Sequence, residues 1–303
     1  MTISRRDVLA QGAALALTAG LTPARAQTQI GPYQLDVVSD GALTLPGGFI
    51  FEPMPQDQLM PLLAELGQSA EVLTPPCNVT LLRGGGRTVL FDVGSGADFA
   101  PNSGQLLTSL EAINVAPEDV TDVVFTHAHP DHLWGLLDDF DDLMFPEASY
   151  MIGQSEWDYW TNPATVDEIA PSRTAFAVGA QRRLAMIEDA VSLIQPGDEI
   201  LPGVMAHASF GHTPGHLSFE VNGGGESAMI IGDSIGNPHV AFARPDWPSG
   251  SDQDRDTAAA TRLRQLDQLS QDKMQIVGYH LTGNGLGYVE RHKGGYVFLP
   301  KEA

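Results

Sequence analysis

The chain has 303 residues, of which 43% are hydrophobic, and its formal net charge at pH 7 is −22. A surface this acidic repels nucleic-acid phosphates and anionic lipid headgroups, so we expect no nucleic-acid partner and no strongly anionic substrate. The length and the hydrophobic content suit one large domain with a substantial core.

The first 26 residues have the features of an export signal. The sequence SRRDVL at residues 4–9 is close to a twin-arginine motif, and an apolar run extends from Val8 to Leu21. Ala24-Arg25-Ala26 then forms a small-x-small cleavage site. We therefore predict a signal peptide of the twin-arginine type over residues 1–26, a mature domain over 27–303, and a periplasmic or secreted protein. The alternative is an uncleaved membrane anchor, but the run is short for a span of about 20 residues, so no stable membrane anchoring is expected after cleavage.

Apolar periodicity predicts strands and helices that alternate along the mature domain. Strands are expected near residues 33–39, 78–83, 88–92, 122–126, 148–153, 203–208, 217–222, 227–232, 275–279, 287–290 and 295–299. Helices are expected near residues 56–66, 103–114, 133–142, 154–161, 173–191 and 254–271. The glycine triplets at 84–86 and 223–225 each separate two strands and are interpreted as hairpin turns. These patterns alone indicate a mixed α and β protein.

Two of the predicted helices allow expectations about single residues. In the helix 254–271, apolar residues form a stripe that should face the core: Ala258, Leu263, Leu266 and Leu269. Arg262 and Arg264 should lie on other sides of that helix. In the helix 133–142, the aspartates at 138, 139, 141 and 142 should lie on the exposed side.

Cys77 is the only cysteine, which excludes an intrachain disulfide. Its segment, Pro75-Pro76-Cys77, is away from every metal-binding motif in the sequence. We interpret Cys77 as a small buried hydrophobic residue and assign it no role.

The most informative motif is His127-Ala128-His129-Pro130-Asp131-His132, which directly follows the predicted strand 122–126. Open α/β sheets place their sites on loops that leave the carboxyl ends of strands. Imidazole and carboxylate groups suit zinc and similar divalent ions. The alternative is a polar surface loop, but three histidines and one aspartate in six residues favour a metal site. Such a loop can direct His127 and His129 toward one ion while Asp131 and His132 turn toward a second.

This motif resembles the first metal-binding motif of the metallo-β-lactamase-fold hydrolases, and three later motifs resemble the remaining ligand positions of that family. They are Gly211-His212-Thr213-Pro214-Gly215-His216, Ile230-Ile231-Gly232-Asp233 and Val277-Gly278-Tyr279-His280. The resemblance covers most of the mature domain and implies an α/β fold, the αββα sandwich, in which two mixed β-sheets are flanked by helices. It also implies that His127, His129 and His212 hold one ion, that Asp131, His132 and His280 hold the other, and that Asp233 bridges them.

The ligand set implied by this resemblance calls for two divalent metal ions as cofactors, zinc first, with manganese, iron or cobalt as alternatives. Such a pair lowers the pKa of a shared water to about 7 and so provides a bridging hydroxide as the nucleophile. Asp131 is the candidate catalytic residue, which would pass a proton to the leaving group; the alternative is that Asp131 is only a ligand. Asp92 and His216 are expected to support the ligands without binding an ion themselves.

The chain is most similar to the branch of this family that contains methyl parathion hydrolase and lactonase-like enzymes. Aromatic residues near the motifs predict a pocket for neutral, hydrophobic esters. The candidate substrate-binding residues are Trp134, Trp160, His239 and Phe242, with Trp160 favoured by its resemblance to an aromatic residue of that branch. The alternative is a place in the core for each aromatic residue and a place on the surface for His239.

We therefore expect an exported, dinuclear, metal-dependent hydrolase that acts on a neutral hydrophobic ester, lactone or phosphotriester. One alternative is a glyoxalase-type thioesterase, which would need a basic patch for an anionic glutathione conjugate. The other is a non-catalytic metal-binding module of the same fold, against which the complete set of seven ligands argues. A homodimer is compatible with the resemblance, although no sequence feature demonstrates it.

Overall fold

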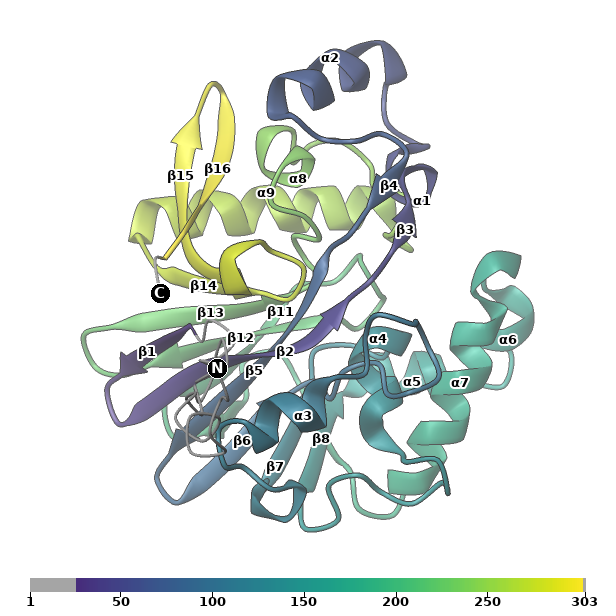
Figure 1. Ribbon diagram of the computed structural model, residues 1–303, viewed down its shortest axis with the longest axis vertical. Coiled ribbons are helices and arrows are strands. Elements are labelled where there is room, and N and C mark those ends of the chain that lie inside the picture. The colour runs from purple at the N-terminus through teal and green to yellow at the C-terminus, as the bar shows by residue number, and fades with distance from the viewer. Residues whose placement is uncertain (1–25, 302–303) are drawn as a thin grey trace, which may run out of the picture.

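Two seven-stranded β-sheets face each other across the centre of the protein, with helices on their outer faces (Figure 1). The structure is a computed structural model that describes residues 26–301. The predicted signal peptide therefore lies outside the described residues, except for Ala26. The remainder forms the αββα arrangement of mixed sheets and helices that was expected.

The first sheet contains strands from the first two thirds of the chain. In spatial order its strands are β1 (Gln27–Ile30), β2 (Tyr33–Ala42), β5 (Pro76–Gly84), β6 (Arg87–Phe91), β7 (Asp122–Phe125), β8 (Ser149–Gly153) and β9 (Ser192–Ile194). The pairs from β1 to β6 are antiparallel, and those from β6 to β9 are parallel. All four residues of β7 are buried, as a parallel strand covered on both faces requires.

The second sheet contains strands from the last third of the chain. In spatial order its strands are β10 (Glu199–Leu201), β11 (Val204–Ala208), β12 (Leu217–Asn222), β13 (Ser227–Gly232), β14 (Gln275–Gly278), β15 (Leu286–His292) and β16 (Gly295–Pro300). Only the pair β13–β14 is parallel. A short pair outside both sheets, β3 (Leu45–Pro46) and β4 (Val72–Leu73), leads into and out of a helical segment.

The helices divide between the outer faces and this segment. Their bounds are α1 (Gly47–Phe51), α2 (Gln56–Leu66), α3 (Leu106–Glu111), α4 (Pro130–Leu133), α5 (Gln154–Thr161), α6 (Thr165–Glu168), α7 (Thr174–Leu184), α8 (Val240–Ala243) and α9 (Arg255–Asp272). Figure 1 shows α9 on one side of the sheets and α3, α5 and α7 on the opposite side. The helix α2 lies beside the hairpin β15–β16, where Lys293 Nζ is 2.7 Å from Glu65 Oε1.

Apolar side chains fill the three interfaces between these layers. Between the sheets, Phe91 of β6 packs against Phe219 of β12 with 5.2 Å between ring centroids. The outer face of the second sheet packs against α9 through Leu266 and Leu269. The cap of α9 is polar: the Asp254 side chain accepts a hydrogen bond from the Thr257 amide, as favoured at a helix N-terminus.

Most predicted elements are confirmed, but the helix predicted over 133–142 is wrong. The helix α4 ends at Leu133 and is followed by a 3-10 turn, Trp134–Leu136. The Asp138 side chain accepts hydrogen bonds from the amides of Phe140 and Asp142, so it stabilises a turn in place of a helix. The aspartates therefore lie on a loop.

Other predictions were wrong in their details. The helix predicted over 173–191 ends at Leu184 and is followed by a 3-10 turn, Ala185–Ile187, before β9 begins at Ser192. In α9, Leu263 is 37% exposed, whereas Arg262 is buried and pairs with Asp252 at 3.2 Å. The sequence also did not indicate several short elements: α1, α6, α8, β1, β3, β4, β9 and β10.

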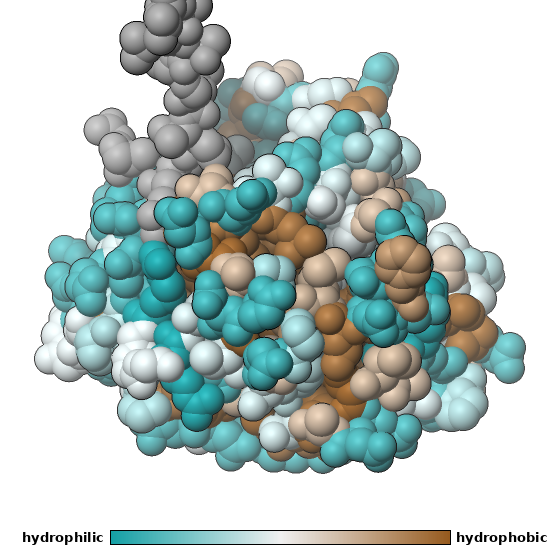
Figure 2. All heavy atoms as spheres, turned by 60° about the horizontal axis from the view of Figure 1, so that its bottom comes forward, coloured by the Kyte–Doolittle hydropathy of each residue, from teal (hydrophilic) through white to brown (hydrophobic). Residues whose placement is uncertain are grey.

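Hydrophilic residues make up most of the face seen in Figure 2, with hydrophobic residues showing in patches among them. Within residues 26–301, none of the helices has the length and apolar character that a membrane span requires.

The buried Tyr150 of β8 gives a prediction about stability at high pH. Its hydroxyl donates a hydrogen bond to the Phe145 carbonyl at 2.7 Å, and burial raises its pKa from 10.0 to about 12. The folded-state pKa lies above the unfolded value, so this stability is fully present below pH 10 and is lost as the pH rises toward 12. We expect urea unfolding to show a steeper fall in the free energy of unfolding over this range for the wild type than for Tyr150→Phe. Equal slopes would contradict the assignment.

Candidate metal centre

The candidate ligands lie on four loops that begin where strands end. The loop after β7 carries His127, His129, Asp131 and His132, and Pro130 starts the short helix α4 within it. The loop from β11 to β12 carries His212. Asp233 directly follows β13, and His280 is the second residue after β14. Because β7 belongs to one sheet and the other three strands to its partner, the four loops meet between the sheets.

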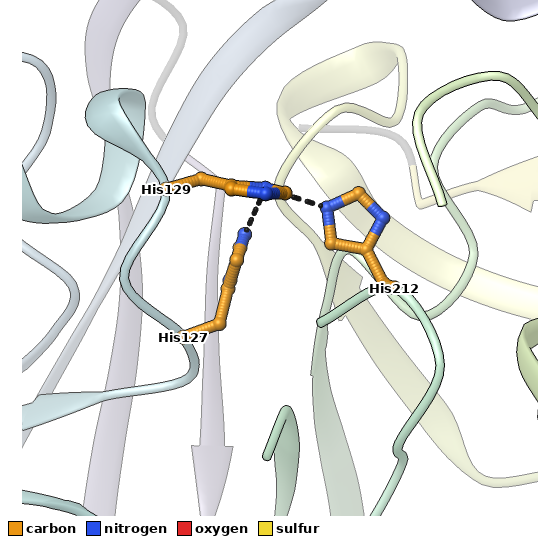
Figure 3. A group of neighbouring side chains, drawn as sticks. All are labelled: His127, His129 and His212. Carbon is orange, nitrogen blue, oxygen red and sulfur yellow. Dashed lines mark hydrogen bonds between the residues drawn. The ribbon is translucent and has the colours of Figure 1, made fainter. Parts of the chain in front are cut away.

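Three histidines point their ring nitrogens at one another (Figure 3). His129 Nδ1 lies 3.1 Å from His127 Nε2 and 2.9 Å from His212 Nε2. All three side chains are buried. Three nitrogens that share one small space have the arrangement of three ligands of a single ion.

A second group lies next to the first. His280 Nε2 is 3.1 Å from Asp131 Oδ2, and His132 Nε2 is 3.5 Å from the same oxygen. Asp233 contacts both groups, because its Oδ2 is 3.4 Å from His212 Nε2 and 3.3 Å from His280 Nε2, while its Oδ1 is 3.4 Å from His132 Nε2. The structure therefore brings all seven predicted ligands together, with Asp233 in the bridging position.

The second ring nitrogen of each of four histidines is anchored by a neighbour. These contacts are His127 Nδ1 with Thr126 Oγ1 at 3.0 Å, His132 Nδ1 with Asp92 Oδ2 at 2.8 Å, His212 Nδ1 with Asp252 Oδ1 at 3.0 Å, and His280 Nδ1 with the Pro76 carbonyl at 2.8 Å. Such partners fix the tautomer and the orientation of a ligating imidazole. The nitrogen that each of the four directs into the cluster is accordingly Nε2.

The buried carboxylates of the cluster favour a positive charge at its centre. Burial lowers the pKa of His127 and His129 well below the usual value, so both rings are neutral and can act as ligands. Burial also acts to lower the pKa of His280, but the Asp233 and Asp131 carboxylates outweigh it and raise the pKa to about 10. The proton on His280 thus balances the negative charge of the two carboxylates. A bound divalent cation would balance the same charge.

One further observation indicates that these ligand atoms fit such cations. Three buried atoms of the cluster have charged neighbours at 3.1–3.5 Å but no well-directed hydrogen bond with a described residue: Asp131 Oδ2, His132 Nε2 and Asp233 Oδ1. Buried polar atoms normally have partners, and exceptions need an explanation such as a missing ion. Cations held among these atoms would satisfy all three.

Asp92 and His216 lie where the sequence predicted them, behind the ligands. Asp92 directly follows strand β6 of the first sheet and has a φ of 66°. Its carboxylate accepts hydrogen bonds from the amide and hydroxyl of Thr126 and contacts His132. His216 Nε2 accepts the Asp233 amide at 3.0 Å, and its Nδ1 contacts Ser209 Oγ at 2.7 Å. Each therefore orients a residue of the cluster without facing its centre.

The sequence did not reveal Glu156 of α5, which joins two of the ligand loops. Its carboxylate is fully buried and accepts four hydrogen bonds, from the amides of Ala128 and Gly215, the Thr213 hydroxyl and the Trp160 indole, at 2.6–2.9 Å. These partners include the loop that carries His127 and the loop that carries His212. No motif marks Glu156, so only the fold reveals this role.

Two further neighbours of the cluster were also missed. Asp252 orients His212 and is itself held by Arg262. Cys77, which we placed away from the metal motifs, is buried as expected but lies beside Asp131 and His280, with ligand atoms within 4.8 Å of one another. That part of the interpretation was wrong, because β5 brings Cys77 close to a strand end 200 residues later in the chain.

A cavity of about 1110 Å³ opens onto the cluster and is lined by Asp131, Asp233 and His280 at that end. Apolar side chains from β3, α1, α2 and β4 line much of the rest, among them Leu45, Phe49, Ile50, Leu62, Leu66 and Leu73. The charged residues on the cavity wall outside the cluster are all paired: Glu65 with Lys293, and Arg244 with Asp246.

Of the four predicted substrate-binding residues, only His239 borders this cavity. Trp160 is completely buried, because Glu156 satisfies its indole nitrogen inside the protein, and it packs edge-on against His129. Phe242 packs against Phe298 in the core between the second sheet and α9. Trp134 packs between Phe99 and the guanidinium of Arg183. These three predictions of cavity wall residues are therefore corrected to packing roles.

Comparisons with known proteins agree with this geometry. The family model of the metallo-beta-lactamase superfamily matches residues 73–274. AidC, a dizinc quorum-quenching lactonase in complex with a product, N-hexanoyl-L-homoserine, superposes with a TM-score of 0.86 and 25% identity, covering 92% of this chain and 98% of that chain. AbOPH, a hydrolase in the beta lactamase superfamily, gives a TM-score of 0.84 and 27% identity with the same coverage.

A probable metal-dependent hydrolase from Staphylococcus aureus shares the fold, with a TM-score of 0.74 and 20% identity over 91% of this chain and 99% of that chain. The sequence has no match among curated proteins.

Proposed function

This chain belongs to the metallo-beta-lactamase superfamily and is a metal-dependent hydrolase of ester bonds, and from that premise we propose that it is a dizinc lactonase for uncharged lactones with an apolar substituent. The observation that carries the proposal is the cavity of about 1110 Å³, which has the metal cluster at one end and apolar walls beyond it. Pockets of this kind bind neutral, hydrophobic ligands. Both the AidC lactonase and AbOPH are similar to this chain over nearly their whole length.

We assign the residues of the two groups to separate tasks. His127, His129 and His212 would hold one ion, Asp131, His132 and His280 the other, and Asp233 both. Two divalent ions, when bound, supply Lewis acidity that polarises an ester carbonyl and activates water. Asp131 borders the cavity and would bind the ion through Oδ2, so we assign its other oxygen, Oδ1, the transfer of a proton from the attacking water to the leaving oxygen.

The thioesterase alternative is weaker on electrostatic grounds. An anionic glutathione conjugate needs unpaired cations, but Lys293 and Arg244 on the cavity wall are already paired with carboxylates. The net charge of −22 also disfavours binding of an anionic substrate. We further propose, from residues 1–26 alone, that the enzyme acts outside the cytoplasm; N-terminal sequencing of periplasmic protein that begins at Gln27 would support this.

The proposal is tested by metal analysis and a substrate panel on zinc-loaded protein. We expect about two ions per chain, and a kcat/KM on acylamino and alkyl lactones at least about tenfold above that on an aryl ester, a phosphotriester and a glutathione thioester. Preference for the thioester would replace lactonase by thioesterase. Two bound ions without turnover of any substrate would indicate a non-catalytic module.

A further inference from the structure

His239 has one ring nitrogen fixed by the backbone. It caps the short helix α8, and its Nδ1 accepts a hydrogen bond from the Val240 amide at 2.8 Å. A nitrogen that accepts carries no proton, so the proton of the neutral ring is on Nε2. Burial lowers the pKa of His239 to about 4, so the ring stays neutral throughout the physiological pH range.

The position of this ring is also fixed. The Asn237 side chain accepts hydrogen bonds from the amides of His239 and Ala241, which holds the turn before α8. The ring also lies near Phe51 of α1, with 6.3 Å between ring centroids. A donor whose backbone and second ring nitrogen are held in place is already ordered before a ligand arrives, which lowers the entropic cost of binding.

The free nitrogen of His239 is available to a ligand. His239 borders the cavity that contains the metal cluster, and none of residues 26–301 forms a hydrogen bond with its Nε2. The ring is partly exposed and lies six residues beyond Asp233 in the chain. His239 thus offers the cavity an uncharged N–H donor on a ring that is anchored through its other nitrogen.

An uncharged donor of this kind recognises an uncharged acceptor. A carboxylate would leave its charge uncompensated here, because the cations Lys293 and Arg244 are already paired. A ligand without any acceptor would leave the N–H without a partner in the cavity, which costs binding energy. A carbonyl oxygen is the acceptor that fits both conditions.

We propose that His239 Nε2–H donates a hydrogen bond to a substrate carbonyl outside the cleaved ester, and so selects lactones that carry an acylamino group over plain alkyl lactones. This inference rests on the proposed lactonase function and adds the group that the enzyme recognises. His239 is thereby a specificity-determining residue, while the cluster acts on the ester itself.

Two variants and one control test the role of His239 on the zinc-loaded protein. His239→Phe keeps a ring but removes the donor, and His239→Asn keeps a side chain that caps α8 but is too short to replace Nε2. His207→Phe is the matched control, because it makes the same change of side chain on β11, outside the lining of the cavity. The substrates are an N-acyl homoserine lactone and an alkyl lactone of equal chain length.

We expect both His239 variants to lose about tenfold in kcat/KM on the acylamino lactone and less than about twofold on the alkyl lactone, with His207→Phe unchanged on both. Equal losses on the two substrates would show a structural role for the helix cap and overturn the inference. An unchanged ratio of the two substrates would overturn it as well.

A binding measurement separates this inference from the proposed function. Calorimetric titration with the uncleavable acylamino lactam and alkyl lactam needs no turnover. If the wild type hydrolyses neither lactone, the proposed function fails, but tighter binding of the acylamino lactam that both variants lose would still support the role of His239. Equal binding of the two lactams by the wild type would refute that role.

Discussion

Replacement of Asp233 by alanine is expected to lower kcat/KM by about a thousandfold or more and to reduce the metal content below two ions per chain. The Asp233 carboxylate contacts both groups of candidate ligands, through His212 on one side and His132 and His280 on the other. Without it, neither ion would keep its full set of ligands, and the spacing between them would no longer be fixed.

The control for this experiment is Asp272→Ala, which removes an exposed carboxylate at the end of α9. Steady-state kinetics and elemental analysis of the two variants side by side give the result, with circular dichroism to verify folding. If Asp233→Ala retained activity within tenfold of the wild type, a mechanism that depends on a bridged pair of ions would have to be abandoned.

Replacement of Glu156 by alanine is expected to destabilise the fold by at least about 4 kcal/mol and to weaken metal binding at the same time. The carboxylate accepts hydrogen bonds from Ala128, Thr213, Gly215 and Trp160, and its removal leaves all four donors buried without a partner. Each such donor costs about 1–3 kcal/mol, so the sum approaches the whole stability of a typical domain.

Urea unfolding of the metal-free and zinc-loaded proteins measures this effect. Glu156→Gln should fall between the wild type and Glu156→Ala, because an amide oxygen can still accept while its NH₂ group faces two donors. Glu168→Ala, at the exposed end of α6, should change stability by less than about 0.5 kcal/mol. Our account of Glu156 would fail if its alanine variant unfolded at the same urea concentration as Glu168→Ala.

The sequence predicted the residues of the metal centre because their signal is local. His127 to His132 follow a short apolar run, so one stretch of chain shows both the strand and the polar loop at its end. Asp233 and His280 also lie just beyond the apolar runs of β13 and β14, and the family resemblance identified them as candidate ligands. The family resemblance then indicated how these residues divide into two groups. Their spacing along the chain does not show this division.

The residues that support the cluster have no such local signal. Glu156 looks like any acidic residue on an amphipathic helix, and its partners are 28 to 59 residues away apart from Trp160. Trp160 was misplaced for the same reason: whether an indole lines a cavity or the core depends on where its N–H finds a partner. Arg262 was placed on the wrong side of α9 because its partner, Asp252, lies outside the helix.

Each group of candidate ligands draws residues from both β-sheets. His212 meets His127 and His129 across the gap between the sheets, and His280 meets Asp131 and His132 in the same way. A bound ion would therefore link the two β-sheets. Its binding free energy would add to the stabilisation that the apolar contacts between the sheets provide. A shortage of the ion would therefore lower both the activity of the enzyme and the lifetime of its folded state, because both depend on the bound ion.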